Sequence, residues 1–180
     1  MKNLLKYSPL IISIFLFTAC KKIHVVSEGQ KILFQYEYVN YSSGFQHYGF
    51  IIDNDGNILI FNKPEKWNFS GSNKILTQAE IEENISSCIP SGKKIPENEL
   101  KKFVNYIDNI AASKVSAPRT RHRASKAGTL SYYCFLFSES DSEYKVVTIK
   151  TEGEVECENL NFFSRRVIEW MRDINRSLNK

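Results

Sequence analysis

Alternation of apolar and polar residues predicts β-strands in the first third of the chain. Between residues 31 and 41, large apolar or aromatic residues recur at every second position, the period of a strand with one buried face. They are Ile32, Phe34, Tyr36 and Tyr38. Residues 49–62 form two apolar runs around Asp55-Gly56. Because Asp-Gly readily adopts the positive φ angles of a tight turn, these two runs predict a β-hairpin.

A change to a helical period follows a polar stretch, residues 64–75, that is predicted to be a loop. Thr77 and Glu80 have the spacing of a capping box, which predicts a helix that begins there and ends near Cys88. A second helix is predicted after Pro96, where apolar residues repeat along one face. They are Leu100, Phe103, Val104, Ile107, Ile110 and Ala111.

The last third of the chain predicts two more strands and a final helix. Residues 129–137 and 144–149 are β-rich runs joined by an acidic loop. The final helix has apolar residues at helical spacing. They are Phe163, Val167, Trp170, Met171, Ile174 and Leu178. The order βββααββα predicts an α+β fold, with a mainly antiparallel sheet of about five strands packed with three helices. No repeat or linker divides residues 31–180, which are predicted to form a single domain.

The N-terminal pattern is different, because it is a short apolar run between lysines. About 14 uncharged residues separate Lys6 from Lys21, fewer than the roughly 20 that a membrane-spanning helix needs. A basic start and a core of this length are typical of a signal peptide. The run ends in Phe17-Thr18-Ala19-Cys20. Two other interpretations of this segment stay open: a signal peptide that is cut at a position other than the cysteine, or a short buried helix in which the cysteine is incidental.

Phe17-Thr18-Ala19-Cys20 resembles the lipobox of bacterial lipoproteins, with Phe17 where leucine is commoner. The resemblance implies that residues 1–19 are a signal peptide cut before Cys20, and that the Cys20 sulfur carries a diacylglycerol. Residues 20–30 would then be a lipidated N-terminus and tether. By the same resemblance, Lys21 in place of an aspartate implies a lipid-anchored protein of the outer membrane, facing the periplasm. The mature part resembles small uncharacterised bacterial lipoproteins, a resemblance that implies no activity.

Composition and cysteine content limit which partners the protein is expected to bind and what state its cysteines are expected to have. Without residues 1–19 the formal charge falls from +4 to about +2, too small to favour nucleic acid as a partner. An exported domain would hold Cys88, Cys134 and Cys157 in an oxidising compartment, where disulfides persist. We therefore expect one disulfide and one remaining thiol, and the sequence leaves all three pairings open.

The residues that could carry chemistry do not form a known catalytic motif. Residues 53–57 suggest a calcium loop, but the EF-hand spacing of glycine and glutamate fails, and a hairpin turn explains them. Neither a metal nor another cofactor is therefore predicted. A cysteine hydrolase would need Cys134 paired with His47 or His122. The sequence contains no G-x-S-x-G, H-E-x-x-H or P-loop motif, although catalytic carboxylates could be dispersed.

One basic segment, residues 119–126, is the strongest concentration of charge in the chain. Its candidate binding residues are Arg119, Arg121, His122, Arg123 and Lys126. Arginines bind carboxylates and phosphates through two parallel hydrogen bonds, and basic residues are attracted to anionic membranes. The alternative is a solvated loop that keeps the protein soluble.

Taken together, these features favour a non-catalytic binding module of the cell envelope. Its partners would be the membrane, through the N-terminal lipid, and an exported protein, as for an inhibitor or immunity protein. One alternative is an envelope hydrolase acting on cell wall or glycan with dispersed catalytic residues. A second is an adaptor that binds anionic lipid or lipopolysaccharide through the basic segment.

Overall fold

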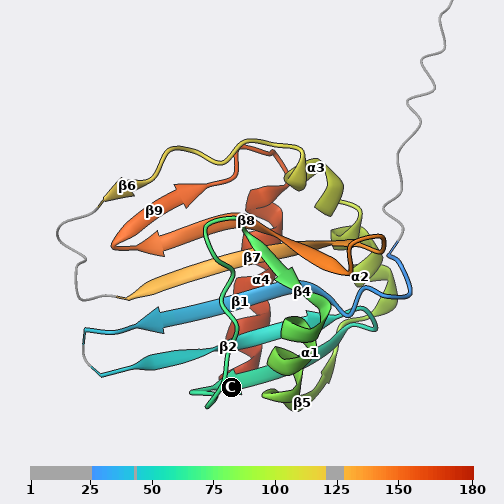
Figure 1. Ribbon diagram of the computed structural model, residues 1–180, viewed down its shortest axis with the longest axis horizontal. Coiled ribbons are helices and arrows are strands. Elements are labelled where there is room, and N and C mark those ends of the chain that lie inside the picture. The colour runs from blue at the N-terminus through green and yellow to red at the C-terminus, as the bar shows by residue number, and fades with distance from the viewer. Residues whose placement is uncertain (1–25, 43, 121–127) are drawn as a thin grey trace, which may run out of the picture.

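A single antiparallel sheet dominates the structure, a computed structural model that describes residues 26–42, 44–120 and 128–180 (Figure 1). Within these residues nine strands pair in the order β5-β3-β2-β1-β7-β8-β9-β6, and β4 pairs with β8. The strands are β1 (Ile32–Asn40), β2 (Gln46–Asp53), β3 (Asn57–Asn62), β4 (Ile75–Thr77), β5 (Ile89–Lys94), β6 (Arg119–Thr120), β7 (Thr129–Ser138), β8 (Glu143–Gly153) and β9 (Val155–Glu158). The helices are α1 (Gln78–Ser86), α2 (Glu97–Val104), α3 (Ile107–Ala111) and α4 (Ser164–Leu178).

The predicted α+β arrangement of about five strands and three helices in the order βββααββα is wrong. The described residues are dominated by the sheet, and the element order is ββββαβααββββα. The four strands that were not predicted, β4, β5, β6 and β9, are two to six residues long. Such short segments carry no readable alternation, and pairing with a longer neighbour decides their conformation.

The helix predicted after Pro96 is also divided in two. α2 ends at Val104, and Asn105 and Tyr106 form a turn before α3, with the Tyr106 N–H donating to the Phe103 carbonyl. The apolar period continues through the turn, so the pattern of apolar residues does not reveal the break. The turn lets the two short helices bury apolar side chains at different places in the same core.

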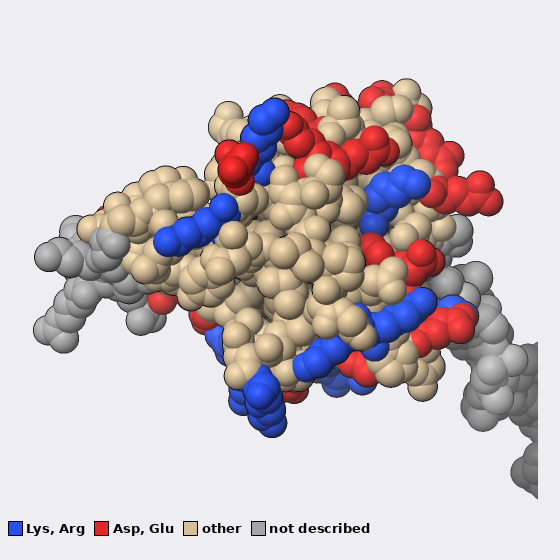
Figure 2. Space-filling model, turned by 90° about the horizontal axis from the view of Figure 1, so that it is seen from below, with Lys and Arg blue, Asp and Glu red and all other residues tan. Residues whose placement is uncertain are grey.

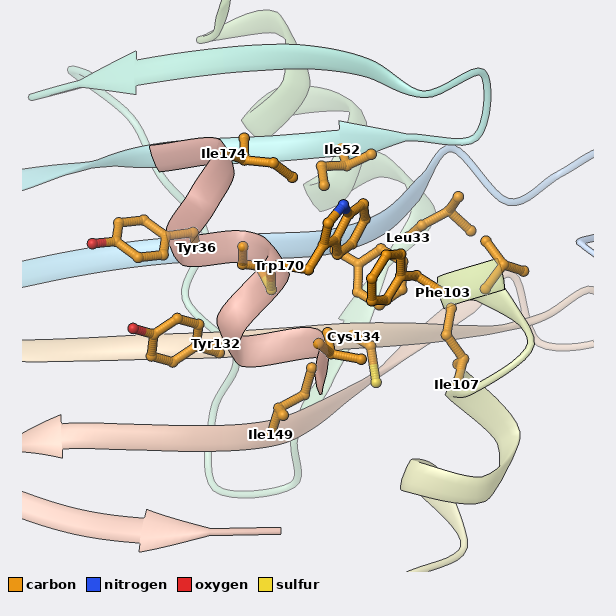
Figure 3. Close-up of a cluster of buried hydrophobic side chains, with 14 of the residues drawn as sticks. Leu33, Tyr36, Ile52, Phe103, Ile107, Tyr132, Cys134, Ile149, Trp170 and Ile174 are labelled. Atoms are coloured by element: carbon orange, nitrogen blue, oxygen red, sulfur yellow. The ribbon is translucent and has the colours of Figure 1, made fainter. Parts of the chain in front are cut away.

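The larger core lies between the sheet and helices α2, α3 and α4. Figure 3 looks from the helix side, with α4 crossing in front of the strands and with Trp170 and Ile174 near Leu33, Ile52 and other sheet residues. The Trp170 ring stacks on Phe103 at 4.0 Å between centroids and meets Phe34 edge-on at 5.2 Å. These contacts fix α2 and α4 on one face of the sheet.

A smaller core lies on the opposite face, beneath α1, β4 and the segment 63–74. Its fully buried members come from β1, β2, β3, β7, β8, β4 and α1. They are Ile32, Ile51, Phe61, Leu76, Ile81, Phe135, Tyr144 and Val146. In Figure 1, α1 and β4 lie in front of one part of the sheet. The left end of the sheet has no helix in front of it. We call this left end, where β1 ends and β2 and β7 begin, the distal end.

An ion cluster also fixes α4 to the sheet. One terminal nitrogen of Arg172, Nη2, donates to both oxygens of the Glu152 carboxylate, at 2.6 and 2.8 Å. Arg172 Nε donates to the Tyr132 hydroxyl at 2.9 Å. Lys150 Nζ lies 2.9 Å from Glu152. Burial alone would raise the pKa of the Glu152 carboxyl, but hydrogen bonds from Lys150 and Arg172 outweigh burial and hold that pKa below its usual value.

This cluster predicts acid-sensitive stability. Because the folded-state pKa of Glu152 is lowered, its contribution is complete above the unfolded carboxyl pKa of about 4.3 and is lost as the pH falls through the folded value. Urea unfolding from pH 7 to pH 3 should show a smaller acid-induced loss of the free energy of unfolding in Glu152→Gln than in the wild type. Glu154→Gln, an exposed neighbour, should behave as the wild type. Identical pH profiles for all three proteins would contradict the prediction.

Candidate functional site

Exposed aromatic side chains gather at the distal end. Four large rings are 72, 44, 43 and 46% exposed. They are Tyr41, Phe45, Tyr48 and Phe69, in that order, and we call them the aromatic tip. Three come from the β1–β2 hairpin, and Phe69 comes from the segment 63–74. Tyr41 packs on Phe45 at 5.3 Å, which brings two exposed rings together.

The surface around this end carries little charge. Figure 2 shows the molecule from the side of β3 and β5, with the distal end to the left. Acidic side chains gather along the upper margin of this view and basic ones along the lower margin. The surface between them, continuing to the left, is largely uncharged. Exposed aromatic rings on an uncharged surface are a composition that protein interfaces favour.

A buried polar pair lies directly beneath the aromatic tip. Glu37 on β1 faces Gly49 on β2, and His47 is two residues from Gly49 on the same face. His47 Nε2 lies 2.8 Å from Glu37 Oε1, and the two side chains are 1 and 7% exposed. Since a carboxylate only accepts, Nε2 carries the proton of this hydrogen bond. A Cβ on Gly49 would lie 2.7 Å from the Phe61 ring, so glycine is needed beside the pair.

Aromatic rings enclose the imidazole of His47. Phe61, Trp67 and Phe69 each have a ring centroid 5.0 Å from that of the imidazole, and Phe45 lies at 6.0 Å. His47 Nδ1 is buried and has no hydrogen-bond partner among the described residues. The imidazole is therefore held by one hydrogen bond and four ring contacts, in surroundings that exclude water.

A small cavity of about 70 Å³ adjoins the Glu37 carboxylate. Gln35, Glu37 and Tyr133 line it from the sheet, and Trp67 and Phe69 line it from the segment above. Gln35 and Tyr133 are directly paired across β1 and β7. Burial, and then the charge of Glu37, raise the pKa of the Tyr133 hydroxyl, so Tyr133 stays protonated. The lining thus brings together the Glu37 carboxylate, two amides, the Tyr133 phenol, several aromatic rings and the Lys74 ammonium.

Sequence reasoning missed Glu37 and Gln35 because β1 was predicted to have one buried face. Both faces are buried: Gln35 and Glu37 are buried on one face, and Phe34 and Tyr36 on the other. The predicted face was also mixed, since a register shift between Ile32 and Phe34 places Ile32 in the smaller core. Two polar residues at alternate positions of an otherwise aromatic strand, with a histidine in the next strand, were the available signal.

The predicted basic site is only partly within the described residues. Arg119 lies in β6, exposed, and pairs with Glu156 of β9 in the sheet. Arg121, His122, Arg123 and Lys126 lie outside the described residues, as does Cys20. Gly128, which follows the basic segment, lies beside the Tyr38 hydroxyl, so the segment ends at the distal end of the sheet.

The hypothesis that Cys134 and His47 form a catalytic pair is wrong. The Cys134 sulfur points into the larger core (Figure 3), whereas His47 lies on the opposite face, bonded to Glu37. Burial raises the pKa of the Cys134 thiol, which keeps it inert. His122, the other candidate, lies outside the described residues. Cys88, Cys134 and Cys157 are all free thiols, so the structure provides no pairing for the expected disulfide.

Residues 53–57 form the predicted hairpin turn between β2 and β3. Asp53 Oδ1 accepts hydrogen bonds from the backbone N–H groups of Asp55 and Asn57, at 3.0 and 2.7 Å, and Gly56 has a φ of 84°. The carboxylate thus caps its own turn. Among residues 26–42, 44–120 and 128–180, no three potential metal-ligating side chains come together.

Comparison with known proteins gives no relative: no family model, curated protein or solved structure matches the chain. In the part of the chain that the structure describes, none of the helices has the length and apolar character needed to cross a bilayer.

Proposed function

We propose that the protein is a lipid-anchored module of the cell envelope that binds an exported protein through the aromatic tip. The aromatic tip is the observation that carries this proposal. Tyrosine and phenylalanine are enriched at protein interfaces, and a few such rings supply most of the binding free energy. An inhibitor or immunity-type protein, which captures a toxin or enzyme, would use a surface of this kind.

The place where the described residues begin supports a binding surface that faces away from the membrane. Val26, the first described residue, lines a hollow with Asn54 and Asp55, at the β2–β3 turn. That turn lies at the end of β2 opposite the aromatic tip. An anchor at Cys20 would therefore hold the domain with the aromatic tip directed away from the membrane. The same geometry counts against the adaptor hypothesis, because Gly128, which directly follows residues 121–127, lies at the distal end as well.

Site-specific photocrosslinking tests the proposal. A photoreactive residue that replaces Tyr41 should crosslink the protein to one partner in the native envelope, which gives one discrete adduct. Mass spectrometry of this adduct identifies the partner, which can then be purified. Ile89, which is 73% exposed on β5, is the matched control position and should not give it. The triple variant Phe45→Ser, Tyr48→Ser, Phe69→Ser should weaken binding of the purified partner at least about tenfold, a loss of roughly 1.4 kcal/mol.

The lipid anchor is tested separately in the same cells. Cys20→Ser should move the protein from the membrane fraction to the soluble fraction, because the acyl chains supply the attachment. Equal adducts at Tyr41 and Ile89, or unchanged affinity in the triple variant, would show that the aromatic tip is not the binding surface.

A further inference from the structure

We propose that the cavity beside Glu37 receives a cationic side chain, lysine or arginine, from the partner that binds the aromatic tip. This inference rests on the proposed function and names the chemistry of the partner at that site. It depends on three observations: a carboxylate oxygen without a hydrogen-bond partner among the described residues, a lining that includes hydrogen-bond acceptors and rings, and one lining residue, Phe69, that also belongs to the aromatic tip.

The carboxylate of Glu37 has unused hydrogen-bonding capacity. Among the described residues its one hydrogen-bond partner is His47, which contacts Oε1. Oε2 has no such partner, although the residue is only 5% exposed and lines the cavity. A buried carboxylate is stable when donors satisfy its oxygens, so the cavity favours an occupant that brings N–H groups.

The rest of the lining suits a cation. The Gln35 amide, which forms no side-chain hydrogen bond with the described residues, offers an oxygen acceptor beside Glu37. Trp67 and Phe69 present aromatic rings, whose faces attract ammonium and guanidinium groups. A volume of about 70 Å³ accommodates the head of one side chain and excludes a larger ligand.

The cavity is joined to the proposed interface by Phe69. This residue belongs to the aromatic tip, is 46% exposed, and also lines the cavity. A partner lying on the aromatic tip would therefore cover the cavity mouth, and a basic residue at its centre would reach Glu37. Charged pairs enclosed in this way at the centre of an interface are frequent hot spots.

Lys74 is the one basic residue lining the cavity in the described part of the chain, and its side chain is exposed. Its positive charge beside the cavity would repel an incoming cation. Removing this charge should therefore make the cavity more receptive to a cation.

Titration with small cations tests the cavity directly. The probes are n-butylammonium and n-butylguanidinium, as mimics of lysine and arginine, with n-butanol as the neutral control. The full chain, purified in detergent, is followed through the NMR signal of the Trp67 indole N–H. We expect a saturable shift with a millimolar Kd for one of the cations and none for n-butanol. Glu37→Gln should weaken this binding at least tenfold, and Lys74→Met should tighten it.

The controls separate this inference from the proposed function. Ile89→Ser, which lies outside the aromatic tip, should leave probe binding unchanged. Because the titration needs no protein partner, the cavity is tested even if the aromatic tip binds no protein. Failure of both cations to give a saturable shift, or equal binding to Glu37→Gln, would overturn the inference and leave the aromatic tip untouched. If the partner captured at Tyr41 binds Glu37→Gln as tightly as the wild type, the cavity does not receive its side chain, and the inference is likewise overturned.

Discussion

Replacing His47 with leucine is expected to lower the free energy of unfolding by about 3–5 kcal/mol, the cost of removing one partner from a buried polar pair. The change leaves the Glu37 carboxylate buried without its hydrogen-bond donor, beneath aromatic rings that keep water away. Urea denaturation of purified protein measures the change directly. Glu37→Gln is the matched control, because an amide oxygen can still accept the hydrogen bond from Nε2 and should cost much less.

The double variant Glu37→Leu, His47→Leu distinguishes a pair effect from loss of packing. With no carboxylate left to solvate, it should be more stable than His47→Leu alone, since apolar replacements of both members of a buried pair are often tolerated. Additive destabilisation in the double variant would mean that the two side chains contribute independently, and that the 2.8 Å contact is energetically unimportant.

Trp170→Ala is expected to destabilise the protein by a similar amount, about 3–5 kcal/mol, because it empties the centre of the larger core. Trp170 joins α4 to α2 and β1: it stacks on Phe103 of α2, meets Phe34 of β1, and its Nε1–H donates to Glu99 Oε1 of α2 at 2.6 Å. The midpoint and free energy of urea unfolding should both fall.

Trp170→Phe separates the stacking from the hydrogen bond. It keeps an aromatic ring against Phe103 and loses the donor to Glu99, so we expect a cost of roughly 1–2 kcal/mol from the lost hydrogen bond and smaller ring. If the alanine and phenylalanine variants were equally stable, or if both resembled the wild type, α4 would not depend on this ring for its attachment.

Local signals in the sequence predicted the local parts of the structure. Asp55-Gly56 does form the turn of the β2–β3 hairpin, and Thr77 and Glu80 do form a capping box at the start of α1. In each case residues within four positions of one another carry the interaction. The long strands β1 and β7 were also predicted close to their observed positions, because their runs of aromatic and β-branched residues are long enough to read. β8 was predicted over 144–149, whereas the strand continues to Gly153.

The rest of the fold depends on contacts that no short stretch encodes. β6 and β9 pair with each other across a sequence separation that includes β7 and β8. β5 contains Pro90 and Gly92, which favour turns, and it is a strand because it lies along the edge beside β3. Neither pairing could be predicted from alternation alone, so the count and order of strands were wrong.

The candidate site was predictable only in part, for the same reason. His47 was recognised as a residue of interest, but its partner is Glu37 on the neighbouring strand, not a cysteine. That pairing follows from the register of β1 and β2, which sets Glu37 opposite Gly49. The aromatic tip likewise needs Phe69 to fold back over the hairpin, a contact that its own loop sequence does not reveal.

The central place of β1 has a mechanical consequence. Its first residues follow the proposed tether and its last residues lead to Tyr41, so tension between a membrane anchor and a captured partner would run lengthwise along this one strand. β1 pairs with β2 on one side and β7 on the other, through hydrogen bonds that lie across the direction of pull. Extracting it requires both ladders to shear at once, an arrangement suited to a domain that must hold its partner under load.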